Sequence, residues 1–388
     1  MANDKDFILK NPVEVGGSTK VTIGDAPASG SVTVGYDLSV AAYDSVFLSV
    51  GSQDTVPTGI TFNNDGTKMY ITGSGIDRVY QYSLSTAFDL STASYDSVSF
   101  SVSGQDGQPQ GLDFNNDGTK MYLIGSGNDS VYQYSLSTAF DLSTTSYDSV
   151  SFSITAQDEG ARGITFNNNG TKMYMVGQNT ASAYQYSLST AFDLSTASYD
   201  SVSFNFSSQE SGSTSIAFNN DGTKLYMVGT VNDTMHQYSL STAFDLSTVS
   251  YDSVSFNVSS QDTVPQGLAF NNDGTKLYMV GSTNDSVYQY TTGSTVATAT
   301  FDTSTGNYFT DTPSADVEYG FSNAGDTQTW QLEVTPSATV TITWDADIEW
   351  SGGTAPDSPA SGEKDIYTIT TDDGGTTYFG VQSADNLS

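Results

Sequence analysis

The sequence contains no cysteine, a single histidine and few basic residues. Its 388 residues include 11 Lys and Arg against 44 Asp and Glu, which gives a formal net charge of −33. The absence of cysteine excludes disulfides and thiolate metal sites. One histidine leaves almost no material for a Ser-His-Asp or Cys-His catalytic arrangement. So acidic a chain is also unsuited to nucleic acid and to anionic membrane surfaces, because both require clustered Lys and Arg.

Long apolar runs are missing as well. No stretch approaches the length of a membrane helix. The first ten residues, MANDKDFILK, lack the apolar segment of a signal peptide. We therefore expect a chain that is not exported through the general secretory route.

What the sequence does contain is one unit repeated five times. The string Phe-Asn-Asn-Asp-Gly-Thr-Lys begins at Phe62, Phe114, Phe218 and Phe270, and again at Phe166 with Asn in the Asp place. Successive starts are 52 residues apart. An aromatic-Asp-Leu string and a Tyr-Asp-Ser string recur with the same step. A spacing this constant indicates a repeat protein.

Each unit is typical of four short strands. In the second unit, Val98–Val102 alternates apolar and Ser residues, as in a half-buried strand, whereas Met121–Ile124 is apolar throughout. The Asn-Asn-Asp-Gly string supplies a tight hairpin turn, after which the apolar strand Met121–Ile124 begins. A four-stranded unit of this length has the size of a propeller blade. The predicted fold is all-β: a five-bladed β-propeller with a small N-terminal β segment and a C-terminal β-sandwich-like domain.

The order of strands predicts how the ring closes. Calling the strands A to D from centre to rim, the propeller starts with a D strand near Tyr43–Val50 and ends after a C strand at Val287–Tyr290. One blade is therefore split between the two ends of the propeller. We expect an N-terminal attachment segment in residues 1–35, the propeller in residues 36–290, and the C-terminal domain in residues 291–388, which holds all three tryptophans.

Two resemblances follow from these strings. The hairpin Asn-Asp-Gly-Thr-Lys-Met/Leu-Tyr resembles the signature of WD-like and YVTN-type propeller repeats, over about two-thirds of the chain. The opening FILKNPVEVGGSTKV looks like the start of tail-fibre and other virion proteins of marine bacteriophages. The stretches GNYFTDTP, TWDADIEWSGGTAP and DGGTTYFGVQSADNLS are similar to a C-terminal module of the same proteins.

The phage resemblance implies a non-enzymatic virion appendage, a tail fibre or tail-associated protein assembled in the host cytoplasm. Its partners would be other tail proteins, further copies of itself and a host cell-surface receptor, with a glycan as one candidate. Two alternatives stay open. One is a purely structural decoration or spacer of the virion. The other is a glycan-degrading enzyme, since carboxylates alone are sufficient for glycoside hydrolysis.

Among the loops and turns, differences between the repeats are confined to the D–A and B–C loops, which share one face of a propeller. Such loops commonly carry binding function. The alternative is that the loop sequences drift because nothing constrains them. Within them a Gln-acid pair recurs on the 52-residue step. The candidate receptor-binding residues are these pairs and one arginine: Gln53, Asp54, Gln105, Asp106, Gln157, Asp158, Arg162, Gln209, Glu210, Gln261 and Asp262.

Ring closure would arrange these five carboxylates in a circle near the channel mouth. Such a circle can hold a hard cation such as calcium or accept sugar hydroxyls. The alternative, which we favour, is that each acid stabilises its own turn. Apart from this cation we expect no cofactor, and we assign no catalytic or metal-ligating residue. His236 occupies a position held by Tyr in other repeats, which indicates packing.

Overall fold

The computed structural model describes residues 23–387, which form two compact units. One unit is residues 34–294, and the other combines residues 23–33 with residues 295–387. The opening stretch FILKNPVEVGGSTKV lies outside the described residues, and so do residues 1–22 of the expected N-terminal attachment segment. No helix within residues 23–387 is long and apolar enough to cross a membrane.

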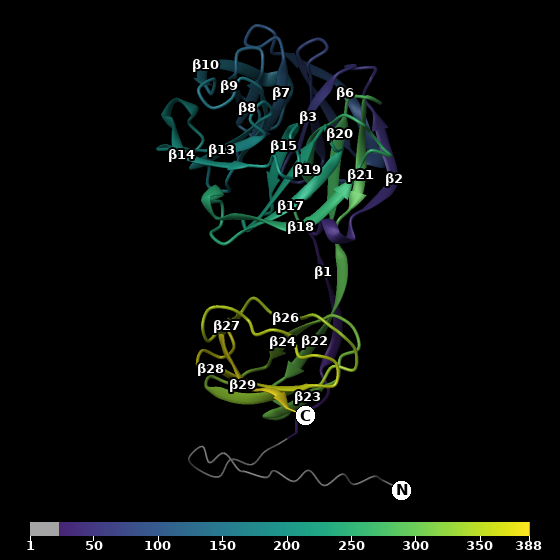
Figure 1. The fold of residues 1–388 in the computed structure, drawn as a ribbon, viewed down its shortest axis with the longest axis vertical. Coiled ribbons are helices and arrows are strands. Elements are labelled where there is room, and N and C mark those ends of the chain that lie inside the picture. The colour runs from purple at the N-terminus through teal and green to yellow at the C-terminus, as the bar shows by residue number, and fades with distance from the viewer. Residues whose placement is uncertain (1–22, 388) are drawn as a thin grey trace. The chain divides into compact units, whose positions relative to one another are not determined.

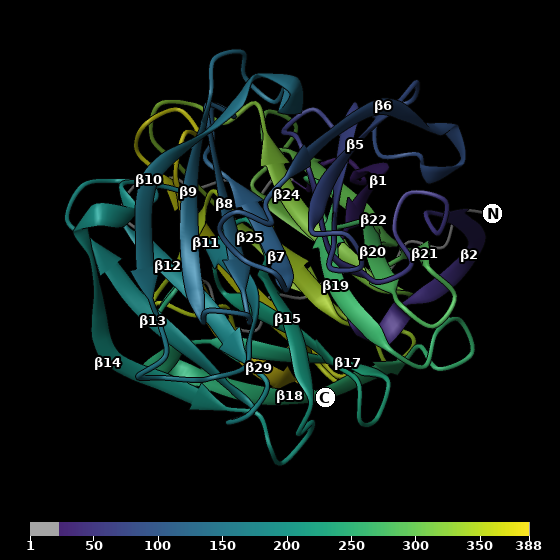
Figure 2. The same cartoon turned by 90° about the horizontal axis from the view of Figure 1, so that it is seen from above.

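Residues 34–294 form five four-stranded antiparallel blades (Figures 1 and 2). Blade 1 contains β3 (Pro57–Phe62), β4 (Lys68–Gly73), β5 (Arg78–Leu84) and β6 (Ala93–Ser101). Blade 2 contains β7 (Pro109–Phe114), β8 (Lys120–Gly125), β9 (Ser130–Leu136) and β10 (Thr145–Ser153). Blade 3 contains β11 (Ala161–Phe166), β12 (Lys172–Gly177), β13 (Ser182–Leu188) and β14 (Ala197–Asn205).

The remaining blades follow the same pattern. Blade 4 contains β15 (Ser213–Phe218), β16 (Lys224–Gly229), β17 (Thr234–Leu240) and β18 (Val249–Asn257). Blade 5 contains β19 (Pro265–Phe270), β20 (Lys276–Gly281), β21 (Ser286–Thr291) and β2 (Ala42–Ser49). A short 3-10 helix precedes each outer strand: η1 (Leu38–Val40), η2 (Leu90–Thr92), η3 (Leu142–Thr144), η4 (Leu194–Thr196) and η5 (Leu246–Thr248).

The ring closes through blade 5, as the strand order predicts. β2 pairs antiparallel with β21, so a strand from the start of the propeller completes a blade from its end. The inner strands β3, β7, β11, β15 and β19 contact one another in a circle. Figure 2 shows the outer strands β2, β6, β10, β14 and β18 at the rim. The five-bladed fold is thus confirmed.

The A–B hairpin is held by its own side chains. In blade 1, Asn63 Oδ1 accepts from Lys68 N at 2.9 Å, and Asp65 Oδ1 accepts from Thr67 N at 2.9 Å. Gly66 has a φ of 68°, in the left-handed region, and an added Cβ would lie 2.2 Å from the Phe88 ring. Glycine is therefore required there for both conformation and space.

Each outer strand carries a bulge that directs its acid toward the lysine of the hairpin. In β6 the register shifts between Tyr95 and Val98, opposite Gln81–Tyr82, and Ser97 takes a φ of 61°. Asp96 is thereby placed 3.5 Å from Lys68 Nζ. The equivalent ion pair in blade 5, between Lys276 and Asp44 at 2.6 Å, spans the ring closure. The five lysines of the hairpins thus neutralise the carboxylates of the Tyr-Asp-Ser strings.

The second unit is a sandwich of two sheets. One sheet contains β1 (Ala28–Val34), β22 (Ser294–Asp302), β24 (Val317–Ser322) and β26 (Ile342–Trp344). The other contains β23 (Tyr308–Asp311), β25 (Gln328–Val334), β28 (Lys364–Thr371), β29 (Tyr378–Leu387) and β27 (Ile348–Trp350). The sequence places residues 1–35 in a separate segment, whereas the structure pairs β1 with β22 of the C-terminal unit.

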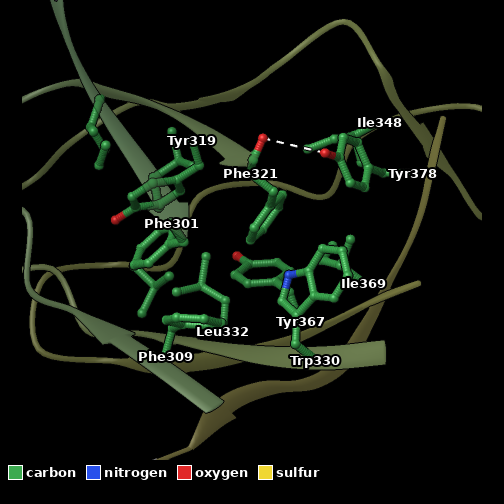
Figure 3. Close-up of a cluster of buried hydrophobic side chains, with 14 of the residues drawn as sticks. Phe301, Phe309, Tyr319, Phe321, Trp330, Leu332, Ile348, Tyr367, Ile369 and Tyr378 are labelled. Atoms are coloured by element: carbon green, nitrogen blue, oxygen red, sulfur yellow. Dashed lines mark hydrogen bonds between the residues drawn. The ribbon is translucent and has the colours of Figure 1, made fainter. Parts of the chain in front are cut away.

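The two sheets bury one aromatic core between them. Phe301 and Phe321 of the first sheet lie with Trp330 and Tyr367 of the second in a single cluster of buried side chains (Figure 3). Phe321 and Trp330 have ring centroids 5.1 Å apart across the sandwich. Aromatic pairs at this spacing contribute packing beyond their buried area. The core explains why the three tryptophans gather in this part of the chain.

Candidate functional site

The five inner strands enclose a cavity of about 200 Å³ along the propeller axis. Because only five strands converge there, the channel is narrow. Hydroxyl, amide and small apolar side chains line most of it. One position of the repeat lines the channel in all five blades and differs among them. It is held by Thr61, Asp113, Thr165, Ala217 and Ala269.

Asp113 on β7 is the single ionisable residue among those that line this cavity. Its Oδ1 accepts from the N–H of Phe114 at 2.8 Å. The backbone of Phe166 and the hydroxyl of Thr165, both on the next inner strand, also favour its charged form. Burial outweighs these bonds and raises the pKa of the Asp113 carboxyl to about 7. The channel therefore contains one carboxyl that changes charge near neutral pH.

A ring of asparagine side chains surrounds the turn-face end of the channel. Asn64 and Asn272 line the cavity, and each ring member donates its Nδ2 to the backbone carbonyl of the next blade's asparagine. The bond from Asn272 to Asn64 O closes the ring across 208 residues. The five donors are Asn64, Asn116, Asn168, Asn220 and Asn272. The ring itself consists of side-chain amides and main-chain carbonyls.

The acids predicted on the opposite face are buried in their own loops. Asp54 is 4% exposed, and its carboxylate accepts from the N–H groups of Val56 at 2.9 Å, Gly75 at 3.0 Å and Ile76 at 3.3 Å. Tyr80 donates to it as well, at 3.2 Å. Each acid thus ties the D–A loop of its blade to the B–C loop. The equivalent acids are buried too: Asp106, Asp158, Glu210 and Asp262.

The geometry matches the turn-stabilising alternative for these acids. Their oxygens face backbone donors, and no group of three or more His, Asp or Glu side chains in residues 23–387 is placed to hold a metal ion. The paired glutamines serve neighbours as well, since the Tyr82 hydroxyl donates to Gln53 Oε1 at 3.1 Å. Matching bonds join Tyr134 to Gln105 and Tyr186 to Gln157. Receptor contact by the five Gln-acid pairs and by Arg162 stays a prediction.

Arg162 lies on β11, outside the residues that line the channel cavity. Its Nε donates to Gln178 Oε1 at 2.9 Å, and its Nη2 donates to the same oxygen. Burial lowers the pKa of the guanidinium, and the nearby Asp158 opposes that effect. The side chain thus links β11 to the B–C loop of its own blade.

Sequence reasoning missed Asp113, although a signal was present. Superposing the five repeats puts Asp113 in register with two threonines and two alanines. An ionisable residue that replaces small neutral ones in an inner strand stands out on that comparison alone.

His236 on β17 packs as an aromatic ring. It is 6% exposed, and its ring centroid lies 5.8 Å from that of Tyr251. Burial lowers its pKa, and Glu210 opposes that shift. Blade 4 therefore combines a longer acid with a smaller ring, whereas blade 1 combines Asp54 with Tyr80. The two changes compensate in size.

A double substitution should restore the pattern of blade 1 in blade 4. We expect His236→Tyr alone to overpack the site and Glu210→Asp alone to leave a gap, each costing about 1–3 kcal/mol. The free energy of unfolding of the double variant should lie within about 0.5 kcal/mol of that of the parent. Measured by urea unfolding, this is a favourable coupling in a double-mutant cycle.

The double variant should also lose the pH dependence of stability that His236 causes. The depressed pKa of His236 gives stability that is present above the usual value near 6.5 and lost as the pH falls. Additive single effects would contradict this coupling.

Comparison with known proteins identifies one matching family. The model described as "Lactonase, 7-bladed beta-propeller" matches residues 112–305. These residues run from β7 to just beyond β22, and five blades are present where that description gives seven. No curated protein matches.

Several solved structures are similar at low identity. A putative 6-phosphogluconolactonase from Bacteroides uniformis is 13% identical, with a TM-score of 0.40 over 60% of this chain and 65% of that one. A periplasmic gluconolactonase from Pseudomonas aeruginosa is 12% identical, with a TM-score of 0.37 over 61% and 66%. A protein from Lactobacillus plantarum is 14% identical, with a TM-score of 0.38 over 50% and 53%. The chain thus spans about half to two-thirds of these proteins, and likeness at this level carries no conclusion about activity.

The family match corrects the function expected from the sequence. The resemblance to phage tail-fibre proteins is wrong, because the matching family is a lactonase family and its match lies over the propeller repeats. The expectation of a non-enzymatic virion appendage is wrong for the same reason, and so is the exclusion of enzymatic activity. The virion location and the partners were inferred from that resemblance and stay untested predictions.

Proposed function

The chain belongs to the seven-bladed β-propeller lactonase family, and from this premise we propose that it hydrolyses a small neutral lactone in its central channel. The observation that carries the proposal is Asp113, the one ionisable side chain that lines an otherwise uncharged cavity. A carboxylate held in a secluded site is suited to act as a general base.

The chemistry requires one base and one water. Ionised Asp113 takes a proton from water, and the oxygen of that water attacks the lactone carbonyl carbon. The bond between that carbon and the ring oxygen then breaks, and the ring oxygen takes up the proton. The product is a hydroxy acid, so atoms and charge balance without a redox partner. Asp113 suits this role because its pKa of about 7 lets it accept and return a proton near neutral pH.

The surroundings of Asp113 favour a neutral substrate. None of the residues that line the cavity is Lys or Arg, so a phosphorylated lactone finds no counter-charge there. The volume of about 200 Å³ is below the range of drug-sized pockets, which suits a compact ring. The net charge of −33 also repels the anionic product after ring opening.

Other nucleophile-activating groups lie elsewhere. His236, the single histidine of the sequence, is buried on a C strand beside Tyr251 and does not line the cavity. The buried acids on the loop face do not line the cavity, and their oxygens accept hydrogen bonds within their own loops. Asp113 is therefore the group to test first.

Proton release on ring opening provides a direct assay. The full chain at pH 8 should acidify a solution of neutral γ- and δ-lactones of sugar acids in a pH-stat, above the spontaneous rate. The 6-phosphorylated counterpart of the same lactone should be hydrolysed at least tenfold more slowly in kcat/KM. No turnover of any neutral lactone would refute the proposed function, and preference for the phosphorylated one would refute the assigned substrate class.

A further inference from the structure

A groove of about 530 Å³ in the C-terminal sandwich is unrelated to the propeller channel. It lies where the end of β27, the following loop and β29 come together. One indole ring, four polar side chains and several small residues line it. They include Trp350, Ser351, Thr354, Asp357, Gly380 and Gln382.

The indole of Trp350 is held in place from several sides. Gly380 is its partner in the parallel pairing of β27 and β29. A Cβ on Gly380 would lie 2.8 Å from the ring, so only glycine lets the indole lie against that strand. Trp344 and Tyr367 contact it edge-on, with centroid distances of 4.8 and 5.9 Å. Tyr367 belongs to the core drawn in Figure 3. The groove thus contains a half-exposed ring with little freedom to move.

Polar groups surround the ring. Ser351 is anchored by its N–H, which donates to Gly380 O at 3.0 Å, and Gln382 is anchored by a bond from Nε2 to Asp365 Oδ2 at 2.9 Å. Thr354 and Asp357 are exposed on the loop. Hydroxyl, amide and carboxylate groups of this kind hydrogen-bond to sugar hydroxyls, and an aromatic face packs on the C–H face of a pyranose.

The charge of the groove narrows the class of ligand. None of its lining residues is Lys or Arg, and Asp357 is acidic. Phosphorylated, sulfated or carboxylated ligands are therefore disfavoured. A purely apolar ligand would leave the polar groups without partners. We propose that this groove binds a neutral saccharide, with Trp350 as the stacking platform and the loop groups as hydrogen-bonding partners.

The test uses the full chain and a panel of neutral oligosaccharides that contains glucans, mannans, galactans and chitin oligomers. Isothermal titration should detect binding of at least one of them. Trp350→Ala should weaken that binding at least tenfold, since stacking on the ring is lost. Phe379→Ala is the matched control, because Phe379 is 45% exposed on the same strand pair but does not line the groove. It should bind like the parent.

A second variant covers the case in which Trp350→Ala fails to fold. Thr354→Arg places a bulky side chain on an exposed loop position without touching the core, and it should block binding while the thermal midpoint is retained. Asp113→Asn should leave saccharide binding unchanged, which separates this inference from the lactonase proposal. Three outcomes would overturn the proposal. No saccharide of the panel binds, both groove variants bind saccharide as tightly as the parent, or the groove binds tetramethylammonium and none of the saccharides.

Discussion

Replacing Asp113 with Asn is expected to lower kcat/KM for lactone hydrolysis by about 10²–10⁴-fold, the contribution of a well-placed general base. The amide keeps the size of the side chain and removes its ability to take a proton. In the parent, kcat/KM should rise with pH through about 7, because the carboxyl must be ionised to act. The variant should show no such rise. Asp113→Asn with parental activity and pH profile would refute the role of this residue.

The same residue should cost the protein stability at alkaline pH. Burial raises the folded-state pKa of Asp113 from its usual 3.8 to about 7. The contribution of Asp113 to stability is therefore complete below pH 3.8 and is lost as the pH rises through about 7. The loss amounts to roughly 4 kcal/mol at most. Asp113→Thr installs the residue found at positions 61 and 165, and it should raise the free energy of unfolding at pH 8 but not at pH 4. Urea unfolding at the two pH values measures this difference.

Loss of activity together with a gain of stability would identify Asp113 as a functional residue. Small neutral side chains are tolerated at the other four positions of the set, so the fold does not require a carboxyl there. Active sites commonly contain groups that are unfavourable for folding. A merely structural acid would show the opposite pattern, in which Asp113→Thr destabilises the protein at both pH values.

The second large effect concerns the closing blade. In blade 5, Ser49 of β2 pairs with Ser286 of β21. The equivalent pair in blade 2 is Ser153 of β10 with Ser130 of β9. Cysteines at either pair are expected to form a disulfide, because directly opposed residues of antiparallel strands lie within disulfide range. The sequence has no other cysteine, so no competing bridge can form.

The closing bridge should stabilise the propeller more than its matched control. The loop that Ser49→Cys/Ser286→Cys closes contains about ten times as many residues as the loop closed by Ser130→Cys/Ser153→Cys. Chain-entropy arguments then give an extra stabilisation of about 2 kcal/mol, on top of about 3 kcal/mol for the shorter loop. Urea unfolding of the oxidised and reduced forms of both variants measures the two gains. Equal gains would mean that β2 and β21 stay associated in the unfolded chain.

The ion pairs between the hairpin lysines and the outer-strand aspartates show that ring closure depends on residues far apart in the sequence. Lys68 and Asp96 are 28 residues apart, whereas Lys276 and Asp44 make the same contact across 232 residues. Bringing the distant pair together carries a larger loss of chain entropy. The closing blade is therefore the place where the ring is expected to open first.

The repeat by itself determined the propeller. Turn residues such as Gly66 are recognisable because the local backbone conformation requires them. Strands are recognisable because apolar residues alternate between their two faces, so both can be identified from a short stretch of sequence. The split blade followed from the order in which the strands occur along the chain. The turn and strand patterns recur in all five repeats, which excludes a chance match. The short flanking strings had no such repetition, and the function inferred from them was wrong.

Only the tertiary structure decided which side chains are available for chemistry. Asp54 and Asp113 carry the same carboxyl group. That of Asp54 ties two loops together away from the channel, whereas that of Asp113 lines the channel, where burial raises its pKa. Trp350 and Gly380 form one groove although 30 residues separate them in the chain. Burial, hydrogen-bond satisfaction and pKa depend on neighbours that the fold brings together from distant positions. For that reason the sequence fixes the scaffold of this protein, and the assembled scaffold decides where its candidate sites lie.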